Sequence, residues 1–322
     1  MFISHLDEDH INGIDYLVRL GCLTKRSVVI LPLHYPLILK LMVQRNRNTT
    51  NRLDFVDAYD GLYALFDSEA RILGVDDSES ITDPISLDEG LANIKTYSAI
   101  RNMQPLQYKG LWCYIPFNTI LDDDRYVKFQ EALDTEGIER DKLTDITYVQ
   151  QKLDKLIAIY KNLPGNIGGV TAINVNSLNV LSYGVCELDY HRLAVNYFCG
   201  FTKWYHPFWC EFIDDIIHDS RCSCLYTGDC VMEARFNHCL DRIKHILPCI
   251  GMLQIPHHGR ASCYDKNIAI RGDIRSGFTN FNSTHKANKF VKQIVHDFMV
   301  TGRPFLQITE HFHSRMEIYV HL

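Results

Sequence analysis

The sequence lacks the features that mark several common protein classes. Its eleven cysteines include no C-x-x-C pair and are odd in number, which argues against the disulfide framework of a secreted protein and favours reduced thiols. No apolar run is long enough to span a bilayer, and no room for a signal peptide precedes the polar stretch that begins at Ser4. We therefore expect a cytoplasmic protein with no membrane association.

Positive charge is also scarce. The chain carries 33 Lys and Arg residues against 39 Asp and Glu residues, for a formal net charge of −6. This balance provides no global positive field, so a nucleic-acid substrate would need a local basic groove. The chain has 322 residues, of which 46% are hydrophobic, and can bury a large core. A globular enzyme fits these numbers.

A cluster of potential metal ligands lies at the start of the chain, at His5, Asp7, Asp9 and His10. Imidazole and carboxylate groups in one loop can hold the pair of cations that dinuclear hydrolases use. The alternative is a polar turn whose aspartates cap the helix that follows.

Later segments favour the metal interpretation. Residues 173–178 read Ile-Asn-Val-Asn-Ser-Leu and look like an Asn-rich strand, residues 225–229 end in Thr-Gly-Asp, and residues 255–259 contain Pro-His-His-Gly. A weaker match covers residues 280–285, with Thr309 further on. Together with the opening motif, and in this order, these segments resemble the metallo-β-lactamase superfamily in its ComEC-like HxDxDH subgroup.

The resemblance implies an α/β protein with the αββα metallo-β-lactamase sandwich. The motif normally follows several strands, so the fold apparently lacks its N-terminal strands here. We expect either that the native polypeptide begins upstream or that another segment or chain completes the sheet. Residues 1–45 and 166–322 would form the metallo-β-lactamase-like domain, and residues 46–165 an insertion of mixed character.

Local patterns predict individual elements along the chain. Apolar spacing predicts helices over 11–21, 141–163 and 233–247, and a further helix that opens at His34. Apolar runs predict strands at 28–33, 111–115, 170–175, 178–183, 222–226 and 252–255. The acidic stretch 75–90 is predicted to be a loop.

The resemblance also implies the roles of the ligands. Asp229 would bridge two divalent cations, His5 and Asp7 would bind one of them, and Asp9, His10 and a histidine of the Pro-His-His-Gly segment would bind the other. We favour His257 for that last position and keep His258 as the alternative. Because oxygen ligands are numerous and imidazoles few, manganese or mixed occupancy becomes as plausible as zinc.

Further residues are candidates for catalysis and substrate binding. Asp9 is a catalytic candidate at the metal site, and His285 is the candidate that would donate a proton to the leaving oxygen. Lys286 and Arg260 are candidates for binding a phosphate, and Arg260 could equally be solvated. Asn176 or Ser177 would contact a metal-bound water or substrate, or bond at a strand end.

These roles predict a metal-dependent hydrolase, specifically a phosphodiesterase acting on a nucleotide or nucleic acid. Hydrolysis of a small ester or lactam is the second enzymatic hypothesis, because this fold hosts several chemistries. A non-catalytic metal-binding or sensor subunit, acting with a partner protein or as a homo-oligomer, is the third.

Overall fold

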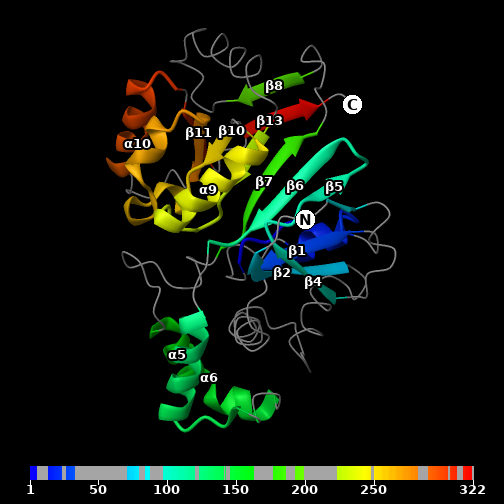
Figure 1. Ribbon diagram of the computed structural model, residues 1–322, viewed down its shortest axis with the longest axis vertical. Helices are drawn as coiled ribbons and strands as arrows, with labels where there is room; N and C mark the ends of the chain where they lie inside the picture. The colour runs from blue at the N-terminus through cyan, green and yellow to red at the C-terminus, as the bar shows by residue number, and fades with distance from the viewer. Residues whose placement is uncertain are drawn as a thin grey trace. The chain divides into compact units, whose positions relative to one another are not determined.

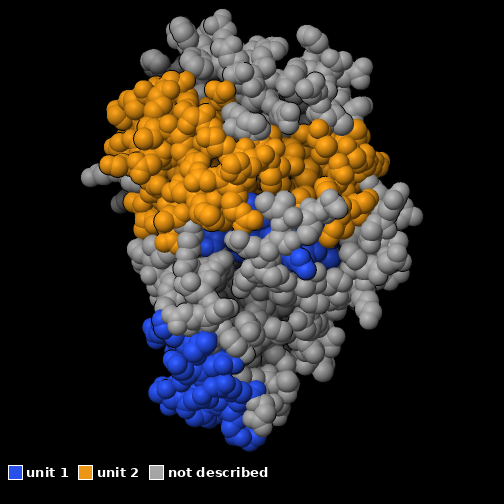
Figure 2. All heavy atoms as spheres, in the orientation of Figure 1, with its two compact units in different colours: residues 1–82, 90–104, 116–178 blue, residues 83–89, 105–115, 179–322 orange. Residues whose placement is uncertain are grey.

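The computed structural model describes residues 1–5, 14–23, 27–32, 71–79, 84–87, 97–119, 123–140, 142, 146–162, 177–185, 193–198, 223–247, 250–281, 289–303, 305–309 and 315–320. The chain divides into two units (Figure 2). Unit 1 comprises residues 1–82, 90–104 and 116–178, and unit 2 comprises residues 83–89, 105–115 and 179–322.

Unit 1 contains a parallel sheet. Among its described residues the strand order is β1 (Val28–Pro32), β2 (Arg71–Glu79) and β4 (Tyr97–Asn102). The start of the chain lies along β1, because the Ile3 amide donates to the Ile30 carbonyl and the Ile30 amide donates to the Met1 carbonyl, both at 2.9 Å. The strand predicted at 28–33 is therefore confirmed.

Strand β2 corrects a prediction. Residues 75–90 were expected to be an acidic loop, but β2 continues to Glu79 and residues 85–86 form the short strand β3 (Ile85–Ser86). Leu73 and Val75 are fully buried in β2, which pairs with a strand on each side. β2 pairs with β1 as far as Val75 and with β4 as far as Glu79, and this tertiary context outweighs the low strand propensity of the acidic residues.

The helices of unit 1 follow the apolar periodicity. Helix α6 (Ile146–Asn162) confirms the core of the helix predicted at 141–163, with Leu156 and Ile159 buried. Helix α2 (Ile14–Arg19) confirms part of the predicted helix at 11–21. Helix α5 (Asp123–Thr135) was not predicted, and it packs against α6.

Unit 2 is organised around a mixed sheet (Figure 1). Among the described residues, eight strands follow the order β12-β11-β10-β9-β7-β6-β5-β3. Strands β9 to β12 are mutually parallel, whereas β7 runs antiparallel to β9. Besides β3, the strands of this sheet are β5 (Leu106–Tyr108), β6 (Trp112–Phe117), β7 (Asn179–Gly184), β9 (Ser223–Tyr226), β10 (Ile250–Gln254), β11 (Ile274–Phe281) and β12 (Phe305–Thr309).

Two helices connect the parallel strands. Helix α9 (Ala234–Ile246) links β9 to β10, and α10 (Lys289–Val300) links β11 to β12. Both connections advance in the same direction across the sheet, and right-handed crossovers then place both helices on the same face. Their buried apolar side chains recur at helical spacing and supply this face of the core: Phe236, Leu240, Ile243, Val291, Ile294 and Phe298.

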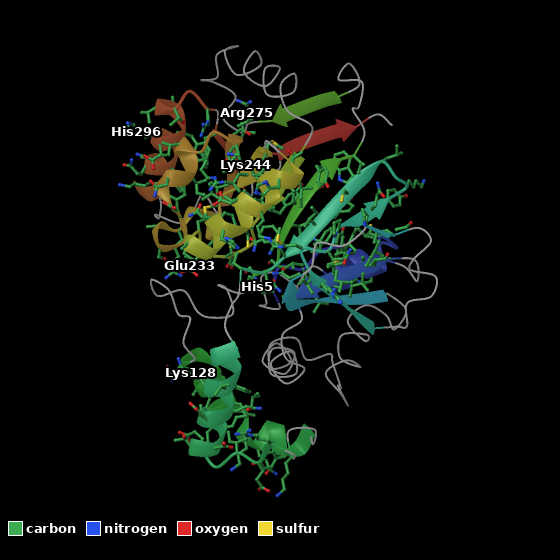
Figure 3. All side chains as sticks on the ribbon, in the orientation of Figure 1. His5, Lys128, Glu233, Lys244, Arg275 and His296 are labelled. Carbon is green, nitrogen blue, oxygen red and sulfur yellow. The ribbon has the colours of Figure 1, made fainter. Side chains whose placement is uncertain are left out.

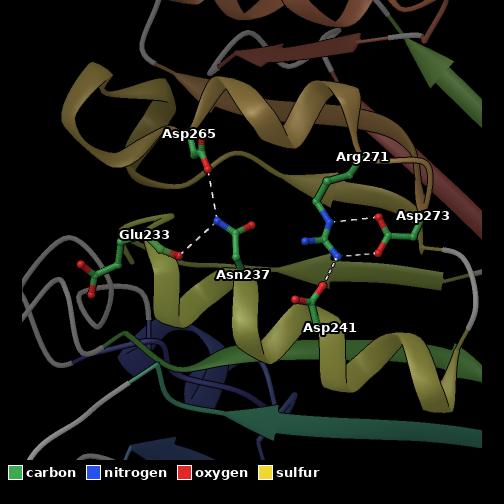
Figure 4. A network of polar contacts seen from close by, with 6 residues as sticks. All are labelled: Glu233, Asn237, Asp241, Asp265, Arg271 and Asp273. Atoms are coloured by element: carbon green, nitrogen blue, oxygen red, sulfur yellow. Dashed lines mark hydrogen bonds and ion pairs between the residues drawn. The ribbon is translucent and has the colours of Figure 1, made fainter.

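A polar network holds α9 against the segment before β11 (Figure 4). The guanidinium of Arg271 donates to both carboxylate oxygens of Asp273, at 3.0 and 2.7 Å, and to Asp241 at 2.8 Å. One turn earlier, Asn237 donates to Asp265 at 3.1 Å. These bonds fix the helix relative to the loop that follows β10.

The observed structure is mixed α/β, as predicted at the level of class. The predicted strands at 111–115, 178–183, 222–226 and 252–255 and the helix at 233–247 are confirmed as β6, β7, β9, β10 and α9. Strands from the predicted insertion at 46–165 belong to both units, because β2 and β4 pair with β1 while β3, β5 and β6 join the larger sheet. The helix expected from His34 and the strand at 170–175 lie outside the described residues.

A separate antiparallel pair is formed by β8 (Leu193–Phe198) and β13 (Arg315–Val320). Within the described segments, no helix combines the length and apolarity that crossing a bilayer requires.

Candidate functional site

His5 is the described member of the opening motif, and it is held in unit 1 (labelled in Figure 3). Its side chain is only 1% exposed. The Nδ1 atom lies 3.1 Å from the Ser4 hydroxyl and 3.2 Å from the Ser177 hydroxyl. Metal-binding histidines commonly engage their second ring nitrogen in this way, which fixes the ring and its tautomer. If His5 binds a cation, Nε2 is the nitrogen that would do so.

Ser177 reaches His5 because two distant chain segments meet. The Leu178 amide donates to the Ser4 carbonyl at 2.8 Å, which joins the start of β7 to the end of the N-terminal segment. Ser177 is fully buried. The structure therefore gives its hydroxyl a contact with His5, and the predicted contact with substrate stays a prediction.

The Thr-Gly-Asp turn of unit 2 follows β9. The Thr227 amide donates to the Gln254 side-chain oxygen at 3.0 Å, and the Thr227 hydroxyl donates to the Gln254 carbonyl at 2.9 Å. Gly228 has φ +53°, a left-handed conformation that glycine adopts without steric cost. The turn is thus fastened to the end of β10 and presents Asp229, which is 5% exposed.

His257 follows β10 and meets Asp229. Their strands are parallel neighbours, so both ligand candidates emerge at the same edge of the sheet. The His257 amide donates to the Gly228 carbonyl at 3.0 Å, and His257 Nδ1 lies 3.5 Å from Asp229 Oδ2. The structure thus brings together two residues that the sequence analysis assigned to one site.

The spacing of these two atoms suits a shared cation. A hydrogen bond between nitrogen and oxygen is usually about 2.9–3.0 Å long, shorter than the 3.5 Å observed here. A tetrahedral ion bound at about 2.0–2.1 Å from each ligand would separate the two atoms by roughly 3.3 Å. Carboxylate oxygen and imidazole nitrogen are also donors that zinc and manganese accept.

His258 and Arg260 flank this pair differently. The His258 ring lies 6.3 Å from the His257 ring, nearly perpendicular to it, and its side chain is exposed. Arg260 is exposed as well, and its amide donates to the His257 carbonyl at 3.0 Å. His257 is therefore the residue in contact with Asp229, while Arg260 is exposed beside the turn.

Two buried thiols, Cys230 and Cys263, lie close enough to Asp229 to sense its charge. Burial, together with the charges of Cys263 and Asp229, raises the pKa of Cys230 well above its ordinary value. Burial also raises the pKa of Cys263 to about 12, although the Ser262 hydrogen bond and the Arg260 charge oppose this rise. Both groups stay protonated near neutral pH and add no negative charge to the site.

Six predicted site residues lie outside the described part of the chain: Asp7, Asp9, His10, Asn176, His285 and Lys286. Within the described part, no three His, Cys, Asp or Glu side chains converge as a metal-binding group. The residues that the structure does bring together are His5 with Ser4 and Ser177 in unit 1, and Asp229 with His257 in unit 2.

Sequence reasoning missed two supporting residues. Ser4 precedes His5 and has no predicted role, although its hydroxyl bonds to His5. Gln254 ends a buried strand and clamps the Thr-Gly-Asp turn. A polar side chain at the end of an apolar strand, three residues before a histidine, was the available signal for Gln254.

The chain was also compared with known proteins. No family model, curated protein or solved structure matches it.

Proposed function

We propose that the chain is a metal-dependent hydrolase that cleaves phosphodiesters of the nucleotide or nucleic-acid class. One observation carries the proposal: Asp229 and His257, from the ends of adjacent parallel strands, face each other at 3.5 Å. Sites at the carboxyl edge of α/β sheets bind ligands in many folds, which supports this placement. The likeness of the four sequence motifs to one hydrolase family is the second support.

Asp229 and His257 are the proposed ligands, with His258 as an exposed neighbour rather than a ligand. A bound divalent ion would supply a Lewis acid and lower the pKa of a coordinated water. The backbone bond from His257 to Gly228 holds the imidazole beside the carboxylate. Both side chains are therefore preorganised, which favours binding of a cation.

His5 is proposed as a further ligand through Nε2, with Ser4 and Ser177 orienting its ring. Asp7, Asp9 and His10 complete the ligand set that the motif implies, for two Zn²⁺ or Mn²⁺ ions. We expect His5→Ala and Asp229→Asn each to lower the metal content of the protein. Metal stoichiometry of the two variants tests this expectation.

The choice of an anionic substrate depends on the residues beside His257. Arg260 presents an exposed guanidinium three residues after it, a group that pairs with phosphate oxygens. His285 stays the predicted proton donor to the leaving oxygen, and Lys286 a predicted phosphate contact. A lactam or simple ester offers less to a guanidinium than a phosphodiester does.

The test combines metal analysis with turnover. Protein purified without chelators should contain one to two equivalents of divalent metal, and it should hydrolyse a chromogenic phosphodiester with added Mn²⁺. Asp229→Asn should abolish turnover and lower the metal content, whereas Asp241→Asn, at an exposed carboxylate on α9, should change neither. Turnover of a chromogenic cephalosporin with no cleavage of the phosphodiester would overturn the choice of substrate. Less than 0.1 equivalent of metal, even after incubation with Mn²⁺ or Zn²⁺, would overturn the proposed function.

A further inference from the structure

The turn that carries His257 has an uncommon backbone. Three consecutive residues are left-handed: His257 at φ +51°, His258 at φ +55° and Gly259 at φ +78°. Residues with a β-carbon incur a steric cost of about 1–2 kcal/mol in this conformation and normally adopt it singly. Two successive histidines there require that the surrounding structure hold them in place.

Hydrogen bonds hold both ends of this turn. The Ile255 amide donates to the Phe278 carbonyl of β11 at 2.7 Å, just before the turn begins. The Gly259 amide donates to the Pro256 carbonyl at 3.0 Å, and the Arg260 amide closes the turn onto the His257 carbonyl. The turn is therefore anchored to the sheet, and its conformation sets the direction of the His257 side chain.

Helix α10 packs on the third residue of the turn. A β-carbon added to Gly259 would lie 3.1 Å from Val291 Cγ2 and 3.3 Å from Ile294 Cδ1. Both of these side chains are buried, at 3% and 0% exposed, so neither can move away into solvent. Gly259 is thus required twice, by its φ angle and by the close approach of α10.

We propose that Gly259, with Val291 and Ile294 packed on it, is a positioning residue that sets His257 against Asp229. The inference rests on the proposed function, because the property it controls is the affinity of this pair for a divalent cation. A larger residue at 259 displaces either the turn or α10. Displacing the turn shifts the His257 side chain, so that its Nδ1 atom no longer lies 3.5 Å from Asp229 Oδ2.

Cobalt binding provides the readout. Co²⁺ replaces zinc in such sites, and its visible absorption reports the number and type of ligands. The full-length chain, freed of metal, is titrated with Co²⁺ as wild type and as Gly259→Ala. The variant is expected to bind Co²⁺ about 10–100-fold more weakly, the range seen when residues supporting a ligand are changed, with an altered absorption band.

Two glycines of the same unit serve as matched controls. Gly302 also has a positive φ, +71°, but a β-carbon there would meet nothing within 4 Å. Gly302→Ala therefore introduces backbone strain without a steric clash, and should lower the urea midpoint while leaving Co²⁺ affinity unchanged. Gly272, which has neither constraint, should tolerate alanine in both measurements.

A compensating variant separates positioning from general damage. Val291→Ala removes the closest contact to the added β-carbon, so Gly259→Ala with Val291→Ala should recover part of the lost Co²⁺ affinity. If Gly259→Ala alone does not fold by circular dichroism, the double variant is compared with Val291→Ala. Equal Co²⁺ affinity in those two folded proteins would overturn the inference.

The Co²⁺ titration distinguishes failure of the proposed function from failure of the role of Gly259. If wild-type protein binds no Co²⁺, the proposed function is overturned, and this inference with it. If wild type binds Co²⁺ and folded Gly259→Ala binds it with the same affinity and spectrum, only the positioning role of Gly259 is overturned.

Discussion

His257 Nδ1 lies 3.5 Å from Asp229 Oδ2, although the helix α9 and the strand β10 separate the two residues in the chain. The approach arises because β9 and β10 are parallel neighbours and each ligand candidate follows its strand by three residues. Gly228 and Gln254 then lock the two turns together through backbone and side-chain bonds. The pair is therefore a product of sheet topology as well as of local sequence.

Replacing His257 and His258 by alanine, one at a time, should identify which histidine binds the metal. His257→Ala is expected to weaken Co²⁺ binding at least about 100-fold, because it removes a donor rather than a residue that supports one. His258→Ala should leave the affinity within a factor of about three, since its side chain is exposed and its ring centroid lies 6.3 Å from that of His257. Isothermal titration of both variants with Co²⁺ provides the measurement. Equal losses would mean that both rings bind metal.

Removing the hydroxyls around His5 should loosen its ring. Ser177→Ala deletes a buried partner of Nδ1 and is expected to reduce metal affinity about 10-fold, with a larger effect when Ser4→Ala is added. Ser177→Thr keeps the hydroxyl and serves as the conservative variant. An unchanged metal affinity in the double alanine variant, with the fold intact, would remove His5 from the proposed ligand set.

The Arg271–Asp273 pair should make stability depend on acid pH. Burial opposes ionisation of Asp273, but its hydrogen bonds and ion pair with Arg271 prevail and lower the pKa below the usual value. The pair's stabilisation is therefore fully present above the unfolded-state pKa of about 3.9 and is lost as the pH falls through the lower, folded-state pKa. Asp273→Asn should destabilise the protein by about 2 kcal/mol at pH 7 and by less near pH 3.

An exposed neighbour offers the control for this experiment. Asp241 accepts a bond from the same guanidinium, but its side chain is 66% exposed, so Asp241→Asn should change the free energy of unfolding by less than about 1 kcal/mol. Urea unfolding of both variants at pH 7 and pH 3 provides the comparison. A pH-independent loss in Asp273→Asn would contradict the assignment to ionic pairing.

The described thiols should differ sharply in reactivity. Cys22 is exposed, whereas Cys230 and Cys263 are buried, and burial raises the pKa of both buried thiols. Because the thiolate is the reacting form, iodoacetamide at pH 8 should label Cys22 and spare the other two. Peptide mass spectrometry quantifies each site, and labelling in urea should remove the difference. Rapid native labelling of Cys230 would contradict its buried placement.

The raised thiol pKa values also predict a loss of stability in alkali. A thiol whose folded-state pKa exceeds its unfolded value stabilises the fold below the unfolded pKa, which is about 8.5 for cysteine. That contribution is lost as the pH rises towards the folded-state pKa of Cys263, about 12.

Cys263→Ser should lower the urea midpoint at pH 7, because it places a more polar group in a buried site.

Much of unit 2 could be predicted because its signals are local. Apolar runs marked β9 and β10, helical spacing marked α9, and the turn residues between them placed Asp229 and His257 at strand ends. The parallel pairing of the strands then brought the two residues together. The mutual approach of this pair is the part of the candidate site that sequence patterns anticipated.

Other features depend on contacts that no local pattern records. Strand β2 ends in acidic residues, yet it still pairs there with β4 through Glu79 and Asn102, in a stretch whose polarity indicated a loop. The bond between Leu178 and Ser4 joins segments that are far apart in the chain, so the burial of Ser177 against His5 could not be read from either segment alone. The left-handed backbone at His257 and His258 is imposed by anchoring to the sheet and to α10.

The parallel direction of strands β9 to β12 has a consequence for protein engineering. Each strand of this quartet is followed by a connection at one rim of the sheet, and each is preceded by a connection at the opposite rim. Randomised libraries confined to the first rim would therefore sample new reactivities, while the second rim, together with the helix-covered face, would conserve the scaffold. A selection for the proposed hydrolytic activity should accumulate its changes along that single rim of the sheet.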